Sequence, residues 1–362
     1  MSGRPLLAAG KELTRWLRLG GRPDQAPRPV IWLYRWRAFW LERSYNLLQK
    51  TGPAAQDSAF PEGEGLIFIQ GFWRAGTTLF HELLSELPDC AAPRTWQCMD
   101  PSAMLTPGGR PSGTETIQRP MDQVMITADS PQEDEFALMA MGVPSVYRGF
   151  LDPRRLPELK YLLDPFFWTE ADPSWLRTLE AFLAWCREPA RKYLVVKSPN
   201  HIFRSPALAA HFPRARFAWI LRDPMELWRS NLKMWRAMIA RYALWMPHNR
   251  ELEDFLEAAL LAYSKILEDS YTKNSFRNQT AFSFEALVKD PAIELPSVID
   301  RLGLGPWESM DDKLQDRMLA KPKESKAKPA HPSEGPIALL NRLRELQEAI
   351  LLEPRNINEV YR

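Results

Sequence analysis

The chain has 362 residues, of which 45% are apolar, and its 47 Lys and Arg nearly balance 45 Asp and Glu. This length and composition suffice for a full hydrophobic core in one large domain. A net charge of +2 gives no electrostatic reason to expect a nucleic-acid partner. No apolar run approaches ~20 residues, so we expect no membrane-spanning helix. Three cysteines without metal-ligand spacing predict no metal site and favour a cytoplasmic protein.

Residues 1–64 are predicted to form a helical, aromatic-rich N-terminal appendage. Within it, residues 30–50 interleave Trp and Phe with Arg along a helix. A basic, Trp-rich amphipathic helix is suited to peripheral contact with a membrane surface. One alternative is that its aromatic face packs on the main domain. A further alternative is that a hydrophobic cleft for an acceptor molecule lies beside it.

Residues 65–87 predict a strand, a glycine-containing turn and an amphipathic helix. The N-terminus of a helix binds phosphate readily, because its first backbone N–H groups lack intrahelical acceptors. Gly76 would allow a phosphate to approach the backbone, and Thr77 and Thr78 would cap the helix and donate hydroxyl groups. Arg74 would add a permanent cation.

The alternative for this turn is purely structural, because a threonine that caps a helix needs no ligand. The turn also differs from the phosphate-binding loop GxxxxGK[ST], since Ala75 and Gly76 precede the threonine pair where that motif requires lysine.

Residues 88–130 are rich in proline and are predicted to be irregular. A helix is expected to follow near Glu133, with Ser130 or Asp129 as its cap. Acidic residues in the first turn would suit the helix dipole. The functional alternative is that Glu133 or Glu135 acts as a general base at a cleft. Further helices, separated by prolines, are expected between residues 153 and 190.

Residues 193–196 predict a buried parallel strand that ends in a polar segment, Lys197 to His201. Ligands of open α/β sheets bind at the carboxyl ends of the strands. We therefore consider His201, expected in the loop before a helix at 205–211, as a site residue. A histidine with a structural role is the alternative.

Another strand, 216–221, leads to Arg222, and the following helix, 225–246, carries Ser230. A guanidinium at a strand end and a hydroxyl on the next helix can hold one anion together. Alternatively, Arg222 forms an ion pair with Asp223 or Glu226.

The rest of the chain predicts a helix at 251–270, a fourth strand at 280–284 and a helical segment at 285–304. A Lys- and Pro-rich loop at 320–336 and a final helix at 336–352 follow. The loop is typical of a solvated linker, or its lysines close over an anionic ligand. The fold expected is α/β, with a central parallel sheet of about four or five strands flanked by helices.

Three blocks, in this order, resemble the sulfotransferases that use 3′-phosphoadenosine-5′-phosphosulfate (PAPS): GFWRAGTTLFHELL, RFAWILRDPMELWRS and FSFEALVKDPAIELPSVIDRLGL. A fourth, KSPNHIFRSPALAAHFP, is similar to the bacterial and Golgi-like branch of that family. The resemblance covers about residues 65–304. It implies a P-loop-like three-layer fold with the sulfotransferase domain at 65–310, completed by 311–362.

The resemblance implies that PAPS is the sulfonate donor and that no metal is needed. Arg74 would stand beside the leaving phosphosulfate as a catalytic residue. Three neighbours, Gly76, Thr77 and Thr78, would bind the 5′-phosphate. Ala75 replaces the usual serine and keeps only its backbone N–H.

For the 3′-phosphate, the resemblance implies Arg222 and Ser230 as ligands. The glycine-rich loop that contributes to this site in many members is not visible, and only the lysines of residues 321–328 offer a substitute.

The general base stays open between three residues. His201 lies four residues after Lys197, whereas the cytosolic branch has its histidine two residues after the lysine. Other branches use a glutamate, and we prefer Glu133 over Glu135 because Glu133 would lie in an apolar, Trp-rich cleft.

The acceptor is expected to be a small molecule, a lipid or a carbohydrate with a hydroxyl group. Two other functions remain as alternatives, a non-catalytic binding protein of the same fold and a phosphotransferase.

Overall fold

The computed structural model describes residues 60–105, 108–111, 116–118, 125–171, 174–245, 250–272, 278–321, 335–352 and 357. The predicted appendage up to residue 59, with its candidate membrane helix at 30–50, lies outside these residues. So do residues 322–334, which hold most of the Lys- and Pro-rich loop. Predictions for these segments stay predictions.

The described residues form two compact units, and each is described by itself. The first contains Phe60, Ala92–Glu188 and Leu232–Ala258. The second contains Pro61–Ala91, Pro189–Asn231 and the described residues from Ala259 onward. Two long helices, α8 (Pro224–Tyr242) and α9 (Glu251–Thr272), contribute residues to both units.

The second unit is built on a five-stranded sheet in the order β2-β5-β1-β6-β7, in which every neighbouring pair is parallel. Its strands are β1 (Leu66–Gln70), β2 (Cys90–Ala91), β5 (Tyr193–Lys197), β6 (Arg216–Leu221) and β7 (Gln279–Ser283). The predicted parallel sheet is confirmed. Strand β2 was not predicted, because its two residues lie in the proline-rich stretch expected to be irregular.

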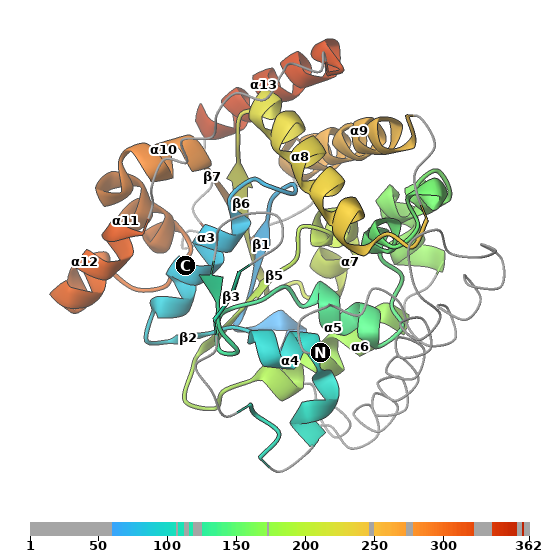
Figure 1. Cartoon of the computed structure of the whole chain (residues 1–362). Helices are drawn as coiled ribbons and strands as arrows, with labels where there is room; N and C mark the ends of the chain where they lie inside the picture. Colours follow the sequence, from blue (N-terminus) through green and yellow to red (C-terminus); the bar gives the residue numbers. More distant parts are fainter. Residues whose placement is uncertain are drawn as a thin grey trace. The chain divides into compact units, whose positions relative to one another are not determined.

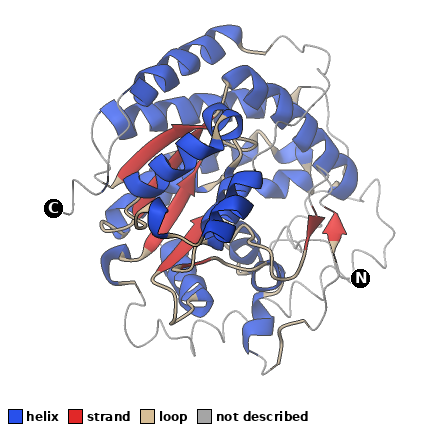
Figure 2. Cartoon of the chain, turned by 90° about the vertical axis from the view of Figure 1, so that its left-hand side faces the viewer, coloured by secondary structure: helices blue, strands red, loops and turns tan. Residues whose placement is uncertain are grey.

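Helices cover both faces of this sheet, as Figures 1 and 2 show. The second unit holds α3 (Thr77–Glu86), α7 (His201–His211), α10 (Phe284–Lys289), α11 (Pro291–Arg301), α12 (Asp312–Ala320), α13 (Ile337–Leu352), η2 (Pro61–Gly63) and η8 (Trp307–Ser309). The chain crosses from β1 to β2 in one direction and from β5 to β6 in the other. Because such crossovers are right-handed, α3 and α7 lie on opposite faces.

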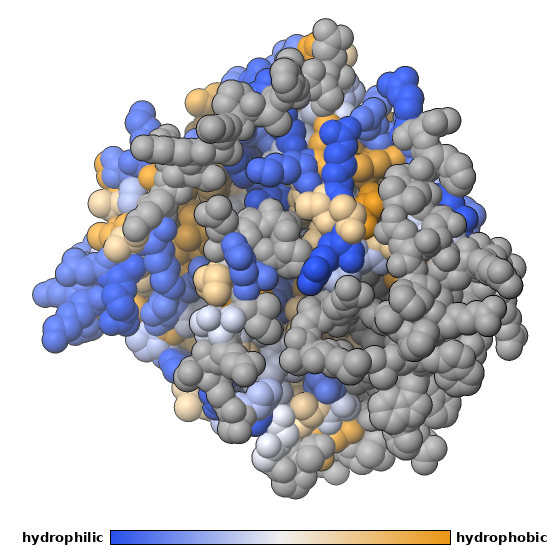
Figure 3. All heavy atoms as spheres, viewed as in Figure 1, coloured by the Kyte–Doolittle hydropathy of each residue, from blue (hydrophilic) through white to orange (hydrophobic). Residues whose placement is uncertain are grey.

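Apolar strands and amphipathic helices form the core of the second unit. Phe68 of β1 is fully buried and stacks on Phe217 of β6 with ring centroids 5.5 Å apart. Helix α3 is fixed to the sheet by buried His81, whose Nε2 donates to the carbonyl oxygen of Val195 at 3.1 Å. Helix α12 buries Leu314 and Met318 and presents a hydrophilic surface, visible in Figure 3.

The first unit consists of short helices and one small antiparallel ribbon. Its elements are α4 (Thr95–Met99), η3 (Pro101–Leu105), β3 (Ile117–Gln118), β4 (Met125–Ile126), α5 (Glu135–Ala140), η4 (Val146–Phe150), η5 (Pro153–Arg155), η6 (Glu158–Leu163), the π-helix η7 (Phe167–Ala171) and α6 (Ser174–Cys186). The prediction that residues 88–130 are irregular is therefore wrong in part. The helices predicted within 153–190 are present: η5, η6 and η7 are short and lie between prolines 153, 157, 165 and 173, and α6 runs for 13 residues. None of the described helices is both long enough and apolar enough to cross a membrane.

Candidate active site

The carboxyl edge of the sheet gathers the predicted anion ligands of the second unit. Strand β1 lies between β5 and β6, so the chain changes its direction of winding at β1, and ligands bind at such switch points. Ile69 of β1 pairs in register with Lys197, the last residue of β5. The carboxyl ends of three neighbouring strands therefore bring together the loop of residues 71–76 after β1, Lys197 at the end of β5 and Arg222 after β6.

The loop after β1, residues 71–76, turns through two left-handed residues before α3 begins. Arg74 has φ 70°, which is uncommon for a residue with a side chain, and Gly76 has φ 99°. Alternating right- and left-handed residues form concave arrays of N–H groups that bind anions. Gly76 occupies the N-cap position and so provides no side-chain cap. The prediction that Thr77 and Thr78 cap the helix is wrong, because they are its first two residues.

Gly76→Ala is expected to lower the free energy of unfolding by roughly 2–5 kcal/mol. The left-handed conformation costs an alanine about 1–2 kcal/mol, and overpacking adds about 1–3 kcal/mol. A methyl group at Gly76 would lie 2.2 Å from the ring of Phe284. The measurement is denaturant unfolding of both forms.

Gly305→Ala is the matched control, because Gly305 in the same unit also has φ 99°, but a methyl group added there would meet no atom of the described residues within 4 Å. It should show the backbone cost alone, about 1–2 kcal/mol. Equal losses in the two variants would show that contact with Phe284 contributes nothing.

The predicted anion ligands are brought together around this loop. The Nε of Arg74 donates to the hydroxyl oxygen of Ser230 at 3.2 Å, and Nη1 of Arg222 donates to the carbonyl oxygen of Arg74 at 2.6 Å. The ammonium of Lys197, buried at the end of β5, donates to the hydroxyl of Thr78 at 3.4 Å. Two cations from neighbouring strand ends, Lys197 and Arg222, thus contact the start of α3 or the loop before it, and a third cation, Arg74, belongs to that loop.

Arg222 is a partly buried cation that leaves one of its N–H donors unused within the described residues. Its Nε is buried and has no hydrogen-bond partner among the described residues. Burial lowers the pKa of its guanidinium group, because desolvation penalises the charged form. The alternative partners are engaged elsewhere, since Asp223 pairs with Arg344 at 2.9 Å and Glu226 with Arg229 at 3.2 Å. A bound phosphate would both accept from Nε and offset the desolvation.

Sequence reasoning assigned no role to several residues that shape this edge. Phe284, the first residue of α10, lies against Gly76 and also 4.7 Å beneath the guanidinium of Arg222. Asn200 accepts a hydrogen bond from the indole of Trp73 at 2.9 Å. Lys197 had a usable signal, because a lysine that ends a buried strand at the carboxyl edge points to an anion. Phe284 and Asn200 had none, because their contacts join residues far apart in the sequence.

His201 lies in the second unit but not in a loop. It is the first residue of α7 and is fully buried, with its ring edge-on to Phe68 at 5.8 Å. The predicted helix start at 205 is wrong because Ser198 begins the turn earlier: its hydroxyl oxygen accepts from the backbone N–H of Asn200 at 3.2 Å. This position is typical of a packing role, and a catalytic role for His201 stays a prediction.

Glu133 and Glu135 belong to the first unit, where both are buried. The hydroxyl of Tyr147 donates to Oε2 of Glu133 at 2.9 Å and so orients its carboxylate. Glu135 is the first residue of α5, and Asp134 occupies the N-cap position. The predicted caps, Ser130 and Asp129, are therefore wrong: the hydroxyl oxygen of Ser130 accepts instead from the backbone N–H of Thr127.

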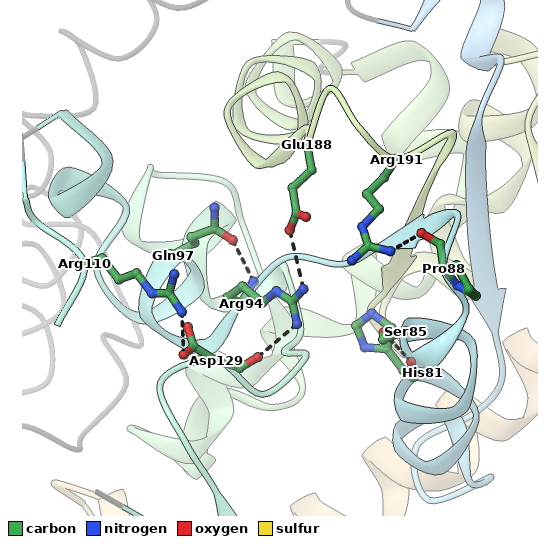
Figure 4. Close-up of polar contacts among 9 residues, drawn as sticks. All are labelled: His81, Ser85, Pro88, Arg94, Gln97, Arg110, Asp129, Glu188 and Arg191. Atoms are coloured by element: carbon green, nitrogen blue, oxygen red, sulfur yellow. Dashed lines mark hydrogen bonds and ion pairs between the residues drawn. The ribbon is translucent and has the colours of Figure 1, made fainter. Parts of the chain in front are cut away.

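The segment before Glu133 is held by Arg94, shown in Figure 4. Arg94 donates to the carbonyl oxygen of Asp129 at 3.1 Å and contacts the carboxylate of Glu188 at 3.4 Å. The backbone of Pro93 accepts from the N–H of Gln132 at 2.9 Å. The backbone next to Glu133 is thus fixed within its unit.

In the part of the chain that the structure describes, no three His, Cys, Asp or Glu residues are grouped in a way that could hold a metal ion.

Comparisons with known proteins add independent evidence. The profile of the sulfotransferase family matches residues 67–309. The chain is 30% identical over 249 residues to "Omega-hydroxy-beta-dihydromenaquinone-9 sulfotransferase Stf3" of Mycobacterium bovis and of Mycobacterium tuberculosis. That match covers 67% of this chain and 63% of the relative, so it spans less than two thirds of the relative's length.

Two solved structures share the fold. Sulfotransferase STF9 from Mycobacterium avium is 19% identical with a TM-score of 0.60, and the match covers 96% of this chain and 98% of that one. Sulfotransferase STF1 from Mycobacterium tuberculosis H37Rv is 17% identical with a TM-score of 0.54, covering 96% and 100%. The three-layer P-loop-like fold is therefore shown, and from the matched family profile the chain belongs to the sulfotransferase family.

Proposed function

We propose that this protein transfers a sulfonate group from PAPS to a hydroxyl group of an acceptor. The observation that carries the proposal is that Lys197 and Arg222 contact the start of α3 and the loop before it, to which Arg74 belongs. A phosphosulfate and a separate phosphate on one nucleotide require such a distribution of cations. Family membership supports this reaction.

At the 5′ end of the donor, the backbone N–H groups of the loop and of the first turn of α3 bind the phosphate. The acceptor oxygen attacks sulfur, the bond from sulfur to the phosphate oxygen breaks, and 3′-phosphoadenosine-5′-phosphate leaves with the electron pair. Arg74 and Lys197 stabilise the charge that develops on the departing oxygen. The acceptor proton passes to a base, for which we propose Glu133.

At the 3′ end, Arg222 and Ser230 bind the second phosphate. Within the described part of the chain the buried Nε of Arg222 has no acceptor, and a guanidinium can bind a phosphate through two parallel hydrogen bonds. The oxygen of Ser230 accepts from Arg74 at 3.2 Å, and the hydroxyl hydrogen of Ser230 is then the donor to the phosphate. These residues fit a donor that carries a 3′-phosphate.

For the acceptor, we propose a hydrophobic molecule with a terminal hydroxyl group. The relatives from Mycobacterium bovis and Mycobacterium tuberculosis are named for an omega-hydroxylated dihydromenaquinone. Trp32, Trp36 and Trp40 lie in the aromatic segment 30–50, which on the sequence prediction would offer aromatic surface to such a molecule. A carbohydrate is the alternative, because aromatic rings also stack on sugars. We propose a cytoplasmic enzyme whose residues 30–50 approach the membrane that holds the acceptor.

Transfer of radioactive sulfur tests the proposal. The protein is incubated with [³⁵S]PAPS and a long-chain alcohol, and in parallel with a soluble oligosaccharide. Label in the alcohol, with little transfer from adenosine-5′-phosphosulfate, which lacks the 3′-phosphate, is the expected result. Label only in the oligosaccharide would contradict the hydrophobic acceptor, and label from [γ-³²P]ATP with Mg²⁺ would favour a phosphotransferase.

A further inference from the structure

Asn231 follows Ser230 on α8 and binds the backbone of the loop after β1. Its side chain is 1% exposed, and its Nδ2 donates to the carbonyl oxygens of Trp73 at 2.7 Å and Leu227 at 2.8 Å. Carbonyl oxygens only accept, so the amide nitrogen must face both of them. The Oδ1 is buried and has no hydrogen-bond partner among the described residues. Asn231 therefore acts on the loop through the hydrogen bonds that its amide nitrogen donates.

The bond to Trp73 is placed where it controls the loop. The peptide unit from Trp73 to Arg74 leads into the left-handed residue, at which Arg74 has φ 70°. Because a trans peptide is planar, holding the Trp73 carbonyl also fixes the direction of the Arg74 N–H. The next carbonyl, that of Arg74, accepts from Arg222 at 2.6 Å. Two consecutive carbonyls are thus held by side chains that follow β6.

We propose that Asn231 is a positioning residue, which keeps the loop in the conformation that presents its N–H groups and the Arg74 side chain to the 5′-phosphate. The neighbouring Ser230 binds the Arg74 side chain at 3.2 Å. Two consecutive residues of α8 therefore act on neighbouring groups: Asn231 holds the carbonyl of Trp73, and Ser230 holds the side chain of Arg74. This inference rests on the proposed function, because it assigns the loop to the donor.

Asn231→Leu keeps most of the side-chain volume and removes both donors. We expect its affinity for 3′-phosphoadenosine-5′-phosphate, measured by calorimetry, to fall about tenfold, since one net hydrogen bond no longer holds the loop. In transfer assays the KM for PAPS should rise, while the KM for the acceptor stays the same. Both measurements are made well below the melting temperature of the variant, which is followed by circular dichroism.

Gln279→Leu is the matched control in the same unit. Gln279 is also fully buried, donates to one backbone carbonyl, that of Ser270 at 2.7 Å, and has a buried Oε1 without a partner among the described residues. It is the first residue of β7, at the opposite edge of the sheet from the loop. We expect this variant to lose stability but to bind the nucleotide as tightly as the wild type.

Three results would overturn the inference. If Asn231→Leu binds the nucleotide like the wild type, Asn231 has only a structural role. If both variants lose affinity equally, the effect comes from general destabilisation. If the wild type itself does not bind the nucleotide, the proposed function fails and the inference fails with it. Should a leucine variant not fold, Asn231→Ala and Gln279→Ala replace the pair, with the same expected contrast.

Discussion

Arg222→Ala is expected to weaken the binding of 3′-phosphoadenosine-5′-phosphate by about a hundredfold or more, while the affinity for AMP falls by at most about tenfold, since only the bond to the Arg74 carbonyl is lost for AMP. Removing one partner of a buried charge pair costs about 2–5 kcal/mol. In this chain the guanidinium is already partly desolvated, which lowers its pKa, and its Nε has no protein partner among the described residues. The loss of affinity should therefore be larger for the ligand that carries a 3′-phosphate. Calorimetry with both nucleotides measures the ratio.

Arg216→Ala provides the matched control, because Arg216 is the first residue of β6, the strand that Arg222 follows. It lies at the amino end of the strand and donates to the carbonyl oxygen of Gly303 at 3.3 Å. The control should leave the ratio of the two affinities unchanged. If Arg222→Ala lost the same affinity for both nucleotides, the assignment of Arg222 to the 3′-phosphate would be contradicted. Arg222 would then act only through the loop, where it binds the carbonyl of Arg74.

Glu133→Gln is expected to lower turnover by about 10²–10⁴-fold while the affinity for the donor stays the same. A glutamine keeps the shape of the side chain but cannot accept the acceptor's proton, and general base catalysis contributes about this factor. The hydroxyl of Tyr147 can still donate to the amide oxygen, so the local structure should be maintained. Single-turnover transfer of labelled sulfonate, with donor binding measured separately, tests this prediction.

Glu135→Gln and His201→Gln are the comparisons, since both residues are competing candidates for the base. We expect Glu135→Gln to retain turnover within a few fold. His201→Gln should lose stability more than turnover, because its ring packs on Phe68 in the core. Near-normal turnover in Glu133→Gln, together with a large loss in one of the other variants, would move the role to that residue.

The parts of the fold that sequence reasoning predicted are those with local signals. The strand, turn and helix of residues 65–87 follow from an apolar run, two glycines and helical spacing, and the structure confirms β1 and α3. The segment with Arg222 and Ser230 was predicted in the same way, because a strand end and the next helix turn are close in sequence. Local patterns thus placed the main predicted anion ligands at one edge of the sheet.

Features that depend on long-range contacts were not predicted. The hydrogen bond from Asn231 to Trp73 joins residues 158 positions apart, and no local sequence pattern predicts it. The two residues of β2 form a strand because β5 pairs with them, although they lie in a proline-rich stretch. The early start of α7 at His201 depends on the Ser198 hydroxyl, whose bond to Asn200 competes with an extended loop. In each case a partner distant in sequence, or a specific side-chain bond, decides the structure.

The central claim is that the edge at β1, β5 and β6 binds a nucleotide with a 3′-phosphate and a 5′-phosphate. Calorimetric titration with 3′-phosphoadenosine-5′-phosphate and with ADP, both without Mg²⁺, tests it most directly. We expect a dissociation constant on the order of micromolar for the first nucleotide and little binding of ADP. No binding of 3′-phosphoadenosine-5′-phosphate, or equal binding of the two nucleotides, would contradict the assignment of Arg222 and Ser230 and favour a non-catalytic member of the fold.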